Sequence, residues 1–537
     1  MNYVDLDNTA AYEKILRLVH RGWEFNYAEL LTAERVRSAL SPMGGGLTYS
    51  WAAKNVDDEV LGYLQALADE QELIGKYQAV LEGETMNTGE SRKVLHHLTR
   101  SPRGLSVTGK AVLYGGKDLG AFYAQELERV ADFACRVHGG EIRGSTGKPF
   151  AAAIQIGIGG SDLGPRALYI ALEQWAAVAG KQRLRASFIS NVDPDDASGI
   201  IEKADLEETV FILVSKSGTT QETLANELFI KQKLINAGLD PSKHILAVTS
   251  ETSPLAHNPA YLDSFYIDDF IGGRYSSTSA VGAVALSLAF GPDVFMELIA
   301  GAHEGDALSL NPHLAQNAAM LDALIGVWER NFLGYPYTAI LPYSQALSRF
   351  PAHLQQLDME SNGKRVNRDG NPVVYPTGPV VFGEPGTNGQ HSFYQLLHQG
   401  TDIVPLQFIG FLESQRGDDI ILDGTGSQTK LTANLAAQIV AFAKGQEDEN
   451  RNKEFIGGRP SSLIVGKQLT PAALGALLSH YENKIMFQGF AWNLNSFDQE
   501  GVQLGKVLTT KVLSALATGK SSGDSALDAY SRLLGIA

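Results

Sequence analysis

Apolar residues follow two different patterns along the chain. Up to about residue 110, Leu, Val and Ala recur among charged residues at helical intervals, as in residues 10–18 and 59–70, and Gly44-Gly-Gly46 interrupts the pattern. This part of the chain is predicted to be helical. From about residue 150, short apolar runs of strand length alternate with segments of helical spacing. Strands that alternate with helices are typical of a parallel, doubly wound α/β sheet.

The strand-length runs form two series. The first series comprises residues 151–158, 186–191, 210–214 and 244–249. The second series comprises residues 337–342, 402–409 and 462–465. Helical segments are predicted at residues 163–175, 280–290 and 351–361. Since a chain of 537 residues is too long for one compact core, we predict two α/β domains.

The stretch from residue 210 to residue 223 changes character in its middle. Residues 210–214 are apolar, which predicts a strand buried on both faces. Ser215-Lys-Ser-Gly-Thr-Thr220 then supplies four hydroxyl groups and one ammonium, and a helix is predicted behind it, ending near Gly238. A helix start favours an anion, and hydroxyls with one lysine suit a phosphate monoester. The alternative is a plain helix cap, which needs only one such residue.

Two other glycine-rich stretches resemble nucleotide-binding loops without matching them. Gly157-Ile-Gly-Gly160 ends a predicted strand but lacks the glycine spacing of a dinucleotide fingerprint. Gly144-Ser-Thr-Gly-Lys148 lacks the first glycine of a Walker loop, because position 142 is Ile. We reject both nucleotide interpretations. Since ligands bind at the carboxyl ends of parallel strands, the turn at 157–160 and the loop at 215–220 are candidates to face one crevice.

The sequence leaves the role of Arg274 open, but it argues against a metal site at the pair His96-His97. Arg274 lies in a glycine-containing loop before the apolar segment 280–290, where it either reaches a ligand or extends into solvent. His96 and His97 are adjacent, and adjacent side chains on a helix point in different directions. The histidine pair is therefore not predicted to chelate a metal.

Composition narrows the class of protein. The net charge of −16 argues against nucleic acid as a partner and means that an anionic substrate needs a local group of Lys and Arg. The single cysteine, Cys135, excludes an intrachain disulfide framework and a thiolate-rich zinc site. The acidic start does not resemble a signal peptide, and the longest apolar run, 280–290, is too short to span a bilayer. We expect a soluble cytoplasmic protein without a membrane partner.

Four charged or titratable residues outside the hydroxyl-rich loop suit proton transfer on a sugar phosphate: Arg274, Glu360, His391 and Lys506. Moving a carbonyl from C1 to C2 requires a base for the C2 proton, and a carboxylate on a rigid helix provides one. An arginine stabilises the developing enediolate, and a histidine is the usual residue for opening a sugar ring. This chemistry requires no metal and no cofactor, and no metal-ligand spacing is visible in the sequence.

The chain resembles the phosphoglucose isomerase (glucose-6-phosphate isomerase) family from about residue 85 to residue 510. Six motifs carry the resemblance and stand in the order that this family has. They are Gly157-Ile-Gly-Gly-Ser-Asp-Leu-Gly-Pro165, Ser215-Lys-Ser-Gly-Thr-Thr-Gln-Glu-Thr223, Gly272-Gly-Arg-Tyr-Ser276, Gln356-Leu-Asp-Met-Glu-Ser-Asn-Gly-Lys364, Gly386-Thr-Asn-Gly-Gln-His391 and Gly501-Val-Gln-Leu-Gly-Lys506.

The resemblance implies a fold of two sugar-isomerase (SIS) α/β domains in a homodimer with shared active sites. A helical segment, residues 1–120, would pack on the second domain. Residues 121–300 would form the first, smaller SIS domain and residues 301–505 the second, with a C-terminal helical arm at 506–537. The implied reaction is the reversible aldose–ketose isomerisation of glucose 6-phosphate and fructose 6-phosphate through a cis-enediolate, in glycolysis and gluconeogenesis.

The resemblance also assigns roles to residues. Glu360 matches the base that moves a proton between C2 and C1, and Arg274 matches the residue that stabilises the enediolate. His391 and Lys506 match the ring-opening pair. The remaining matched residues are substrate contacts, five of them at the phosphate: Ser215, Lys216, Ser217, Thr219, Thr220, Gly160, Ser161, Gln356 and Gln499.

Two other functions compete with this interpretation. A non-catalytic sugar-phosphate sensor would keep the loop at 215–220 but would not need Glu360, His391 and Lys506 together. An amide-transferring synthase would need a glutaminase nucleophile, usually an N-terminal cysteine, whereas the only cysteine is Cys135. The sequence departs from many relatives near Thr278 and from animal relatives at Ser217-Gly218, which bears on sugar specificity and not on the reaction class.

Overall fold

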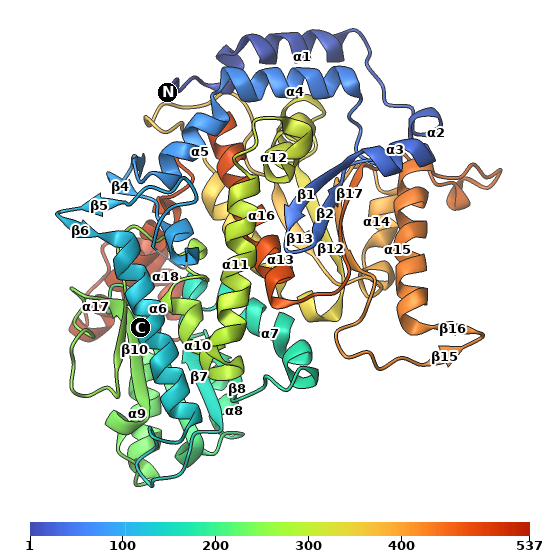
Figure 1. Ribbon diagram of the computed structural model, residues 1–537. Coiled ribbons are helices and arrows are strands. Elements are labelled where there is room, and N and C mark those ends of the chain that lie inside the picture. The colour runs from blue at the N-terminus through green and yellow to red at the C-terminus, as the bar shows by residue number, and fades with distance from the viewer. Residues whose placement is uncertain (102–103, 537) are drawn as a thin grey trace. The chain divides into compact units, whose positions relative to one another are not determined.

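The computed structural model describes residues 1–101 and 104–536 (Figure 1). Residues Met1–Ser496 form one compact unit and Phe497–Ala537 form another. The described residues of the first unit form two large sheets, of five and six strands, and three two-stranded hairpins, and most strands of the large sheets alternate with helices as predicted. The second unit contains α17 (Gln503–Thr518) and α18 (Ser525–Leu533), which agrees with the helical arm expected there. Within the described residues, no helix combines the length and apolarity needed to cross a membrane.

The first sheet is fully parallel and has the strand order β11-β10-β9-β7-β8. Its strands are β7 (Ala152–Ile156), β8 (Arg185–Ile189), β9 (Thr209–Val214), β10 (Ile245–Ser250) and β11 (Ser264–Ile267). Every residue of β9 is buried, which confirms the prediction of a strand covered on both faces. The sequence analysis did not predict β11, whose four residues are too few to show a period.

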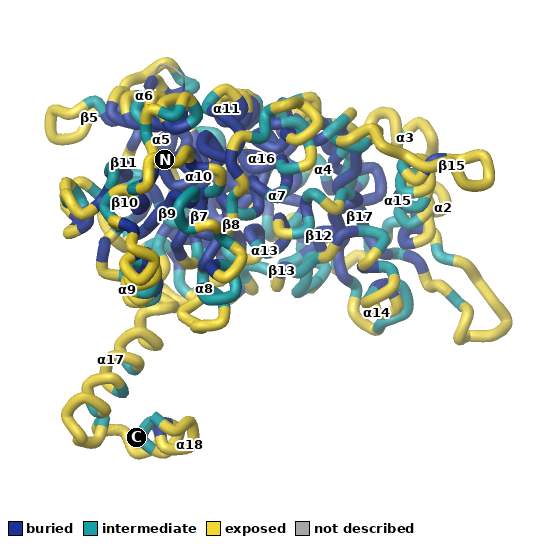
Figure 2. Tube along the Cα trace, turned by 90° about the horizontal axis from the view of Figure 1, so that it is seen from below, coloured by how far each residue is buried: buried dark blue, intermediate teal, exposed yellow. Residues whose placement is uncertain are grey.

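Helices cover both faces of the first sheet. Helices α8 (Pro194–Ile201) and α9 (Gln221–Asn236) contribute Ile201, Ile230 and Leu234 to an apolar core beneath β9. Helix α10 (Ala280–Phe290) is buried along its whole length on the other face, beside α6 (Leu119–His138) and α7 (Leu163–Val178). In Figure 2 the buried residues follow these strands and α10, while α9 presents an exposed outer side.

The second sheet is mixed and has the order β1-β2-β17-β14-β12-β13. Strands β12 (Tyr337–Tyr343), β13 (Val380–Gly383), β14 (Leu406–Phe411) and β17 (Ser461–Gly466) are parallel to one another. The hairpin of β1 (Leu40–Gly44) and β2 (Leu47–Ser50) pairs antiparallel with β17. The prediction that residues 1 to about 110 are helical was therefore wrong for this hairpin, although the break predicted at residues 44–46 is present. The glycines at 44–46 have positive φ angles of 86°, 56° and 74°, and they form the hairpin turn.

The remaining helices surround the second sheet or precede it. Helices α14 (Tyr394–Gln399) and α15 (Ser427–Lys444) pack on one face. Helices α12 (Ala318–Val327) and α16 (Pro471–Ala491) lie on the other, with α11 (Pro292–Leu308) beside α16 (Figure 1). The amino-terminal helices are α1 (Ala10–His20), α2 (Tyr27–Leu30), α3 (Ala33–Ser38), α4 (Asp58–Glu70) and α5 (Leu73–Leu81). Three short hairpins complete the elements: β3 (Thr85–Asn87) with β4 (Arg92–Lys93), β5 (Leu113–Tyr114) with β6 (Lys117–Asp118), and β15 (Ile421–Leu422) with β16 (Thr425–Gly426).

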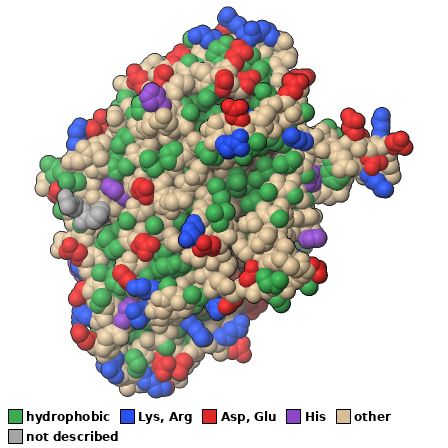
Figure 3. Space-filling view, turned by 45° about the vertical axis from the view of Figure 1, so that its right-hand side comes forward, with side chains coloured by type: hydrophobic (Ala, Val, Ile, Leu, Met, Phe, Trp, Pro, Cys, Tyr) green, Lys and Arg blue, Asp and Glu red, His purple; other side chains and the backbone are tan. Residues whose placement is uncertain are grey.

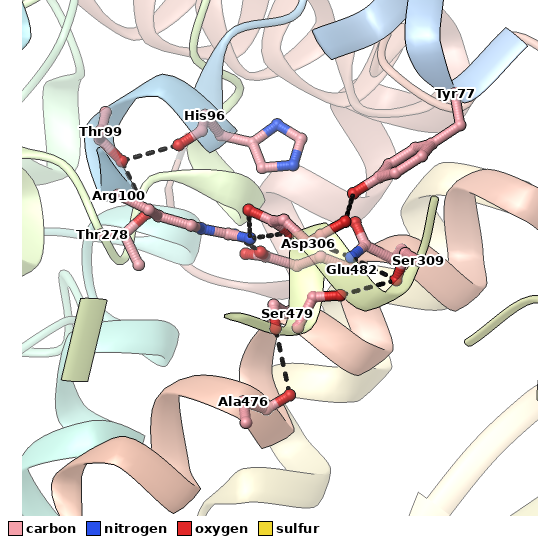
Figure 4. A network of polar contacts seen from close by, with 12 residues as sticks. Tyr77, His96, Thr99, Arg100, Thr278, Asp306, Ser309, Ala476, Ser479 and Glu482 are labelled. Atoms are coloured by element: carbon pink, nitrogen blue, oxygen red, sulfur yellow. Dashed lines mark hydrogen bonds and ion pairs between the residues drawn. The ribbon is translucent and has the colours of Figure 1, made fainter. Parts of the chain in front are cut away.

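A buried ionic network joins the amino-terminal region to α11 and α16 (Figure 4). The Arg100 guanidinium donates to both carboxylate oxygens of Asp306, at 2.8 and 3.0 Å, and pairs with the Glu482 carboxylate. All three side chains are almost completely buried. A buried charge is tolerated when it is paired, so each of these residues fixes the position of the other two.

Charged side chains of both signs are mixed on the surface. On the face drawn in Figure 3, Lys and Arg are interspersed with Asp and Glu, and apolar side chains lie between them. The net charge of −16 therefore forms no single acidic patch on that face. An anionic ligand thus depends on the charges of its own binding site.

Candidate active site

Two loops from the first sheet contact each other through their backbones. The turn Gly159–Ser161 follows β7, and the turn Gly273–Tyr275 carries Arg274. A Cβ atom on Gly160 would lie 2.1 Å from the carbonyl carbon of Gly273. Only glycine permits this approach, which places Ser161 and Arg274 on neighbouring turns.

The hydroxyl-rich loop lies at the same edge of the sheet, because β9 pairs directly with β7. Its hydroxyls are used to fold the loop itself. The Ser215 Oγ accepts a hydrogen bond from Gly218 N at 3.1 Å, and the Ser217 Oγ accepts one from Thr219 N at 3.2 Å. Thr220 stands at the start of α9 and its side chain makes no capping hydrogen bond, so the plain helix-cap interpretation does not hold for Thr220.

Lys216 is held over this edge by the chain around it. Its Nζ donates to the Ile271 carbonyl at 3.2 Å and lies 3.9 Å from the Asp269 carboxylate. Burial lowers the pKa of Lys216, while the Asp269 carboxylate raises it. Ser217 and Thr219 are exposed beside it. The edge therefore presents one ammonium, exposed hydroxyls and the amino end of a helix to solvent.

Arg274 is buried, so the interpretation of a solvated arginine was wrong. Its Nε donates to the Ser361 Oγ at 2.7 Å and its Nη2 donates to the Ser496 carbonyl at 2.7 Å. Its Nη1 lies 3.5 Å from the Glu360 Oε2. The Arg274 side chain is 1% exposed, whereas that of Glu360 is 20% exposed. The carboxylate is thus accessible from outside while its cationic partner is fixed beneath it.

A distortion of a helix positions Glu360. The predicted helix 351–361 is confirmed, but it begins as α13 (Phe350–Gln355) and continues as a π-helical turn, Gln356–Glu360. Single π-helical turns occur frequently at functional sites. The Gln356 amide nitrogen would be 3.2 Å from a Cβ on Gly159, so this side chain lies against the glycine turn. Gln356, Glu360 and Arg274 are therefore brought together with the glycine turn from separate segments.

Two residues of this region were not predicted from the sequence. Ser361 accepts from Arg274 and shares a hydrogen bond of 3.0 Å with the Tyr275 hydroxyl. Asp358 is buried, and its Oδ1 has no hydrogen-bond partner within the described residues. Burial raises the pKa of Asp358 to about 6, although Lys484 lowers it. Both residues lie within the 356–364 motif, which is the only signal that the sequence offered for them.

The remaining candidate residues lie on other segments of the chain. His391 ends the short turn Gly389–His391, where it is exposed, and its imidazole makes no hydrogen bond or ion pair with the described residues. Gln499 and Lys506 belong to the unit Phe497–Ala537, with Lys506 in α17. Their roles stay predictions. In the described part of the chain, no group of three or more His, Cys, Asp or Glu could hold a metal ion.

Comparison with known proteins shows similarity over nearly the whole chain. A family model described as phosphoglucose isomerase matches residues 50–530. Glucose-6-phosphate isomerase of Treponema pallidum (strain Nichols) is 60% identical over 522 residues, which cover 97% of each chain. The enzyme of that name from Borreliella burgdorferi (strain ZS7) is 46% identical over 506 residues, which cover 94% of each chain.

Solved structures agree with the sequence comparison. The crystal structure of a glucose-6-phosphate isomerase from Chlamydia trachomatis matches with a TM-score of 0.89 and 41% identity, covering 99% of this chain and 100% of that one. A hypothetical protein from Thermus thermophilus matches with a TM-score of 0.64 and 24% identity, covering 83% of this chain and 96% of that one. The second likeness concerns the fold alone.

Proposed function

This chain belongs to the phosphoglucose isomerase family and interconverts glucose 6-phosphate and fructose 6-phosphate, and we propose that the residues gathered at the carboxyl edge of the first sheet carry out this reaction. The observation that carries the assignment is the pair of Arg274 and Glu360, with Nη1 and Oε2 3.5 Å apart. A partly exposed carboxylate beside a buried cation provides the base and the oxyanion-stabilising group that an enediolate mechanism uses.

The substrate phosphate binds at the loop formed by Ser215, Lys216, Ser217, Thr219 and Thr220. The support is the position of this loop between β9 and the amino end of α9, where N–H groups and the helix dipole favour an anion. Lys216 supplies a positive charge in a protein whose net charge is −16. Gly160, Ser161, Gln356 and Gln499 are proposed to contact the sugar, the first three from the segments that meet near Arg274.

Proton transfer is proposed to run through Glu360. Its carboxylate removes the proton from C2 of the open-chain aldose, and the electron pair moves through an enediolate whose oxygen charge Arg274 stabilises. The same proton is delivered to C1 while the O2 proton is lost and O1 is protonated, which yields the ketose. His391 and Lys506 are proposed to open the ring beforehand by moving a proton between the ring oxygen and O1.

The enzyme is further proposed to act as a cytoplasmic homodimer in which each active site takes residues from both chains. This would bring the exposed His391 to a site that Glu360 of the partner chain serves. We also propose the domain limits 121–300 and 301–505, with residues 1–120 packing on the second domain. The strands of the two sheets, apart from the hairpin β1–β2, fall within these limits.

The test is a direct assay of the purified protein. Fructose 6-phosphate is incubated with the protein alone, without added metal or nucleotide, and glucose 6-phosphate is followed by NMR. We expect equilibration of the two sugars, with turnover in the range of about 1–10³ per second that is common for enzymes. Binding of the sugar phosphate without conversion would instead identify a sensor.

A further inference from the structure

The two parallel sheets have the same strand arrangement. In the first sheet, β7 lies between β8 on one side and β9 on the other, with β10 beyond β9. In the second sheet, β12 lies between β13 and β14, with β17 beyond β14. In such sheets ligands bind outside the carboxyl ends of the two central strands, where the order of the chain reverses. The crevice at β12 and β14 is therefore the equivalent of the crevice that holds the proposed catalytic residues.

The loops that leave β9 and β14 also fold alike. In the first, Gly218 N donates to the Ser215 Oγ at 3.1 Å, and in the second, Gly417 N donates to the Ser414 Oγ at 3.2 Å. Both glycines have positive φ angles, 66° and 74°. The loop after β14 thus has the same turn as the proposed phosphate loop, Ser215–Thr220. Its sequence, Glu413-Ser-Gln-Arg-Gly417, shares little with the sequence of that loop.

The helices behind the two loops begin differently. At the start of α9, the Thr220 side chain makes no capping hydrogen bond, and no other side chain of the described residues accepts one from the first N–H groups of this helix. At the start of α15, the Asp419 carboxylate accepts hydrogen bonds from Ser427 N at 2.7 Å and from Gln428 N at 3.2 Å. These N–H groups lower the pKa of Asp419. An anion of the chain itself therefore occupies the position at which a phosphate would bind in the first sheet.

A cavity of about 270 Å³ lies at the carboxyl ends of β12 and β14. Its apolar wall includes Phe411, Leu431 and Leu469, and its polar wall includes Ser344, Gln345 and Gln428. No hydrogen bond of the Ser344 and Gln345 side chains joins them to another described residue, so both are available to a ligand. Binding pockets typically combine an apolar surface with a few polar groups in this way, and their volumes begin near 300 Å³.

The charges around the cavity disfavour an anion. Glu413 and Asp418 contribute two carboxylates to its lining. The only cation among the described residues of the lining, Arg416, donates to the Asp418 Oδ2 at 3.1 Å and to the Gln174 Oε1 at 3.2 Å. Glu413 is paired in turn with the Lys467 ammonium at 3.5 Å. A phosphorylated ligand would therefore find no unpaired cation among the described residues of the lining.

We propose that this cavity is a second binding site, which takes an uncharged sugar or polyol of monosaccharide size. The apolar wall covers the C–H face of such a ligand, while Ser344, Gln345 and the Gln428 Oε1 bind its hydroxyl groups. The Gln428 Nε2 donates to the Phe411 carbonyl at 2.7 Å and so holds this side chain in place. Asp419 lies outside the lining and closes the start of α15, beside Gln428, to an anion. The site is separate from the proposed catalytic residues, so it does not depend on their assignment.

The experiment measures binding of sorbitol and of inorganic phosphate to the full-length protein by NMR. The catalytic site is first saturated with a five-carbon sugar-acid phosphate that resembles the enediolate. Wild type is expected to bind sorbitol with a Kd on the order of 1–10 mM and to show no phosphate binding beyond the saturated site. Ala346→Trp, which fills the cavity from its lining, should weaken sorbitol binding at least tenfold while kcat/KM stays unchanged.

Asp419→Ala tests whether the Asp419 carboxylate is what keeps an anion such as phosphate from binding. Removing this carboxylate frees the N–H groups of Ser427 and Gln428, so the variant should acquire millimolar phosphate binding. Asp423→Asn removes the same charge from the neighbouring hairpin without opening the helix start, and it should acquire none. The proposal is overturned if wild type does not bind sorbitol, if Ala346→Trp binds it as well as wild type, or if wild type binds phosphate as well as Asp419→Ala.

Discussion

Arg274 and Glu360 are far apart in the sequence, and folding alone places their charged groups 3.5 Å apart. The sequence predicted both residues as site candidates, but it left open whether Arg274 was solvated. The reason is that burial depends on Ser361 and Ser496, which accept its hydrogen bonds and lie in distant segments. The same holds for Asp358, whose burial no local pattern indicated.

Glu360→Gln should nearly abolish isomerisation, because it keeps the shape of the side chain and removes the base. A lost general base typically lowers kcat about 10²–10⁴-fold. The measurement is kcat together with the exchange of solvent hydrogen into C2 of the substrate. Binding of the five-carbon sugar-acid phosphate should persist.

The matched control is Glu297→Gln, an exposed glutamate on α11, which should behave as wild type. If solvent hydrogen still entered C2 at the normal rate in Glu360→Gln, another group would be the base.

Asp358→Asn should stabilise the protein at neutral pH. Burial raises the pKa of Asp358 to about 6 in the folded state, above about 3.9 in the unfolded state. A raised carboxyl pKa makes wild type lose stability as the pH rises from about 4 to about 6, since the unfolded chain ionises more easily. Above that range Asp358→Asn should be more stable by up to about 3 kcal/mol, and below pH 4 the gain should vanish.

Urea unfolding at pH 4 and at pH 7.5 measures this difference. Asp132→Asn, at an exposed carboxylate paired only with Arg136 among the described residues, provides the comparison and should change the stability little at either pH. A gain of the same size at both pH values would show that Asp358 is not the titrating group.

At the scale of elements, helices and strands were predicted correctly where the apolar runs were long. Short strands, which are defined by pairing with a neighbouring strand, were missed. Strands β7, β9, β12 and β17 and helix α10 follow the predicted ranges closely. β11 and β13 were missed because four residues do not establish a period, and both lie at a sheet edge. The helix behind the loop Ser215–Thr220 was predicted, but two of its large apolar residues, Leu228 and Ile235, are exposed. Its buried face instead carries Ile230 and Leu234 together with polar side chains.

Gly218→Ala should damage the phosphate loop as a unit. Gly218 has a φ of 66°, and a Cβ there would lie 2.2 Å from the Ser253 Oγ. The loop must therefore shift, and KM for fructose 6-phosphate should rise at least tenfold, since hydrogen bonds to a charged group each contribute about 1.5–3 kcal/mol.

Gly238→Ala provides a closely matched control at the other end of the same helix. Its φ is 74°, but a Cβ there meets no atom within 4 Å, so it tests backbone strain without a collision. Its KM should equal that of wild type. Equal KM values for both variants would remove the loop from the substrate site.

At the scale of the whole molecule, the sequence predicted two series of parallel strands and a helical arm, and both features are present, with the two series in one compact unit. It did not predict that an amino-terminal hairpin completes the second sheet. The residues proposed to be catalytic are also distributed on this scale. Arg274 and Glu360 lie together in one unit, while Lys506 belongs to the other, and His391 is exposed on its own turn.

Mixed dimers test whether the active site is shared. Glu360→Gln and His391→Ala homodimers should each be nearly inactive. After unfolding, equal mixing and refolding, random pairing makes about half of the dimers mixed, and one of the two sites in each mixed dimer is intact. About one quarter of all sites should then be active, with the KM of wild type.

The control is the refolding of each variant alone, which should recover nothing. If mixing also recovers nothing while the refolded protein is dimeric, both residues serve the same chain's site.

The hairpin β1–β2 also bears on the order in which the protein assembles during its synthesis. β2 ends at Ser50 and its partner strand β17 begins at Ser461. At about 5–20 residues per second, a ribosome needs roughly 20–80 s for the approximately 410 residues between them. Through that interval the hairpin has left the ribosome while its outer edge has no strand to pair with, and an unpaired edge is a site of misassembly. The outer edge of the first hairpin to be made is thus among the last edges to be paired, and the second sheet is completed only when nearly the whole chain exists.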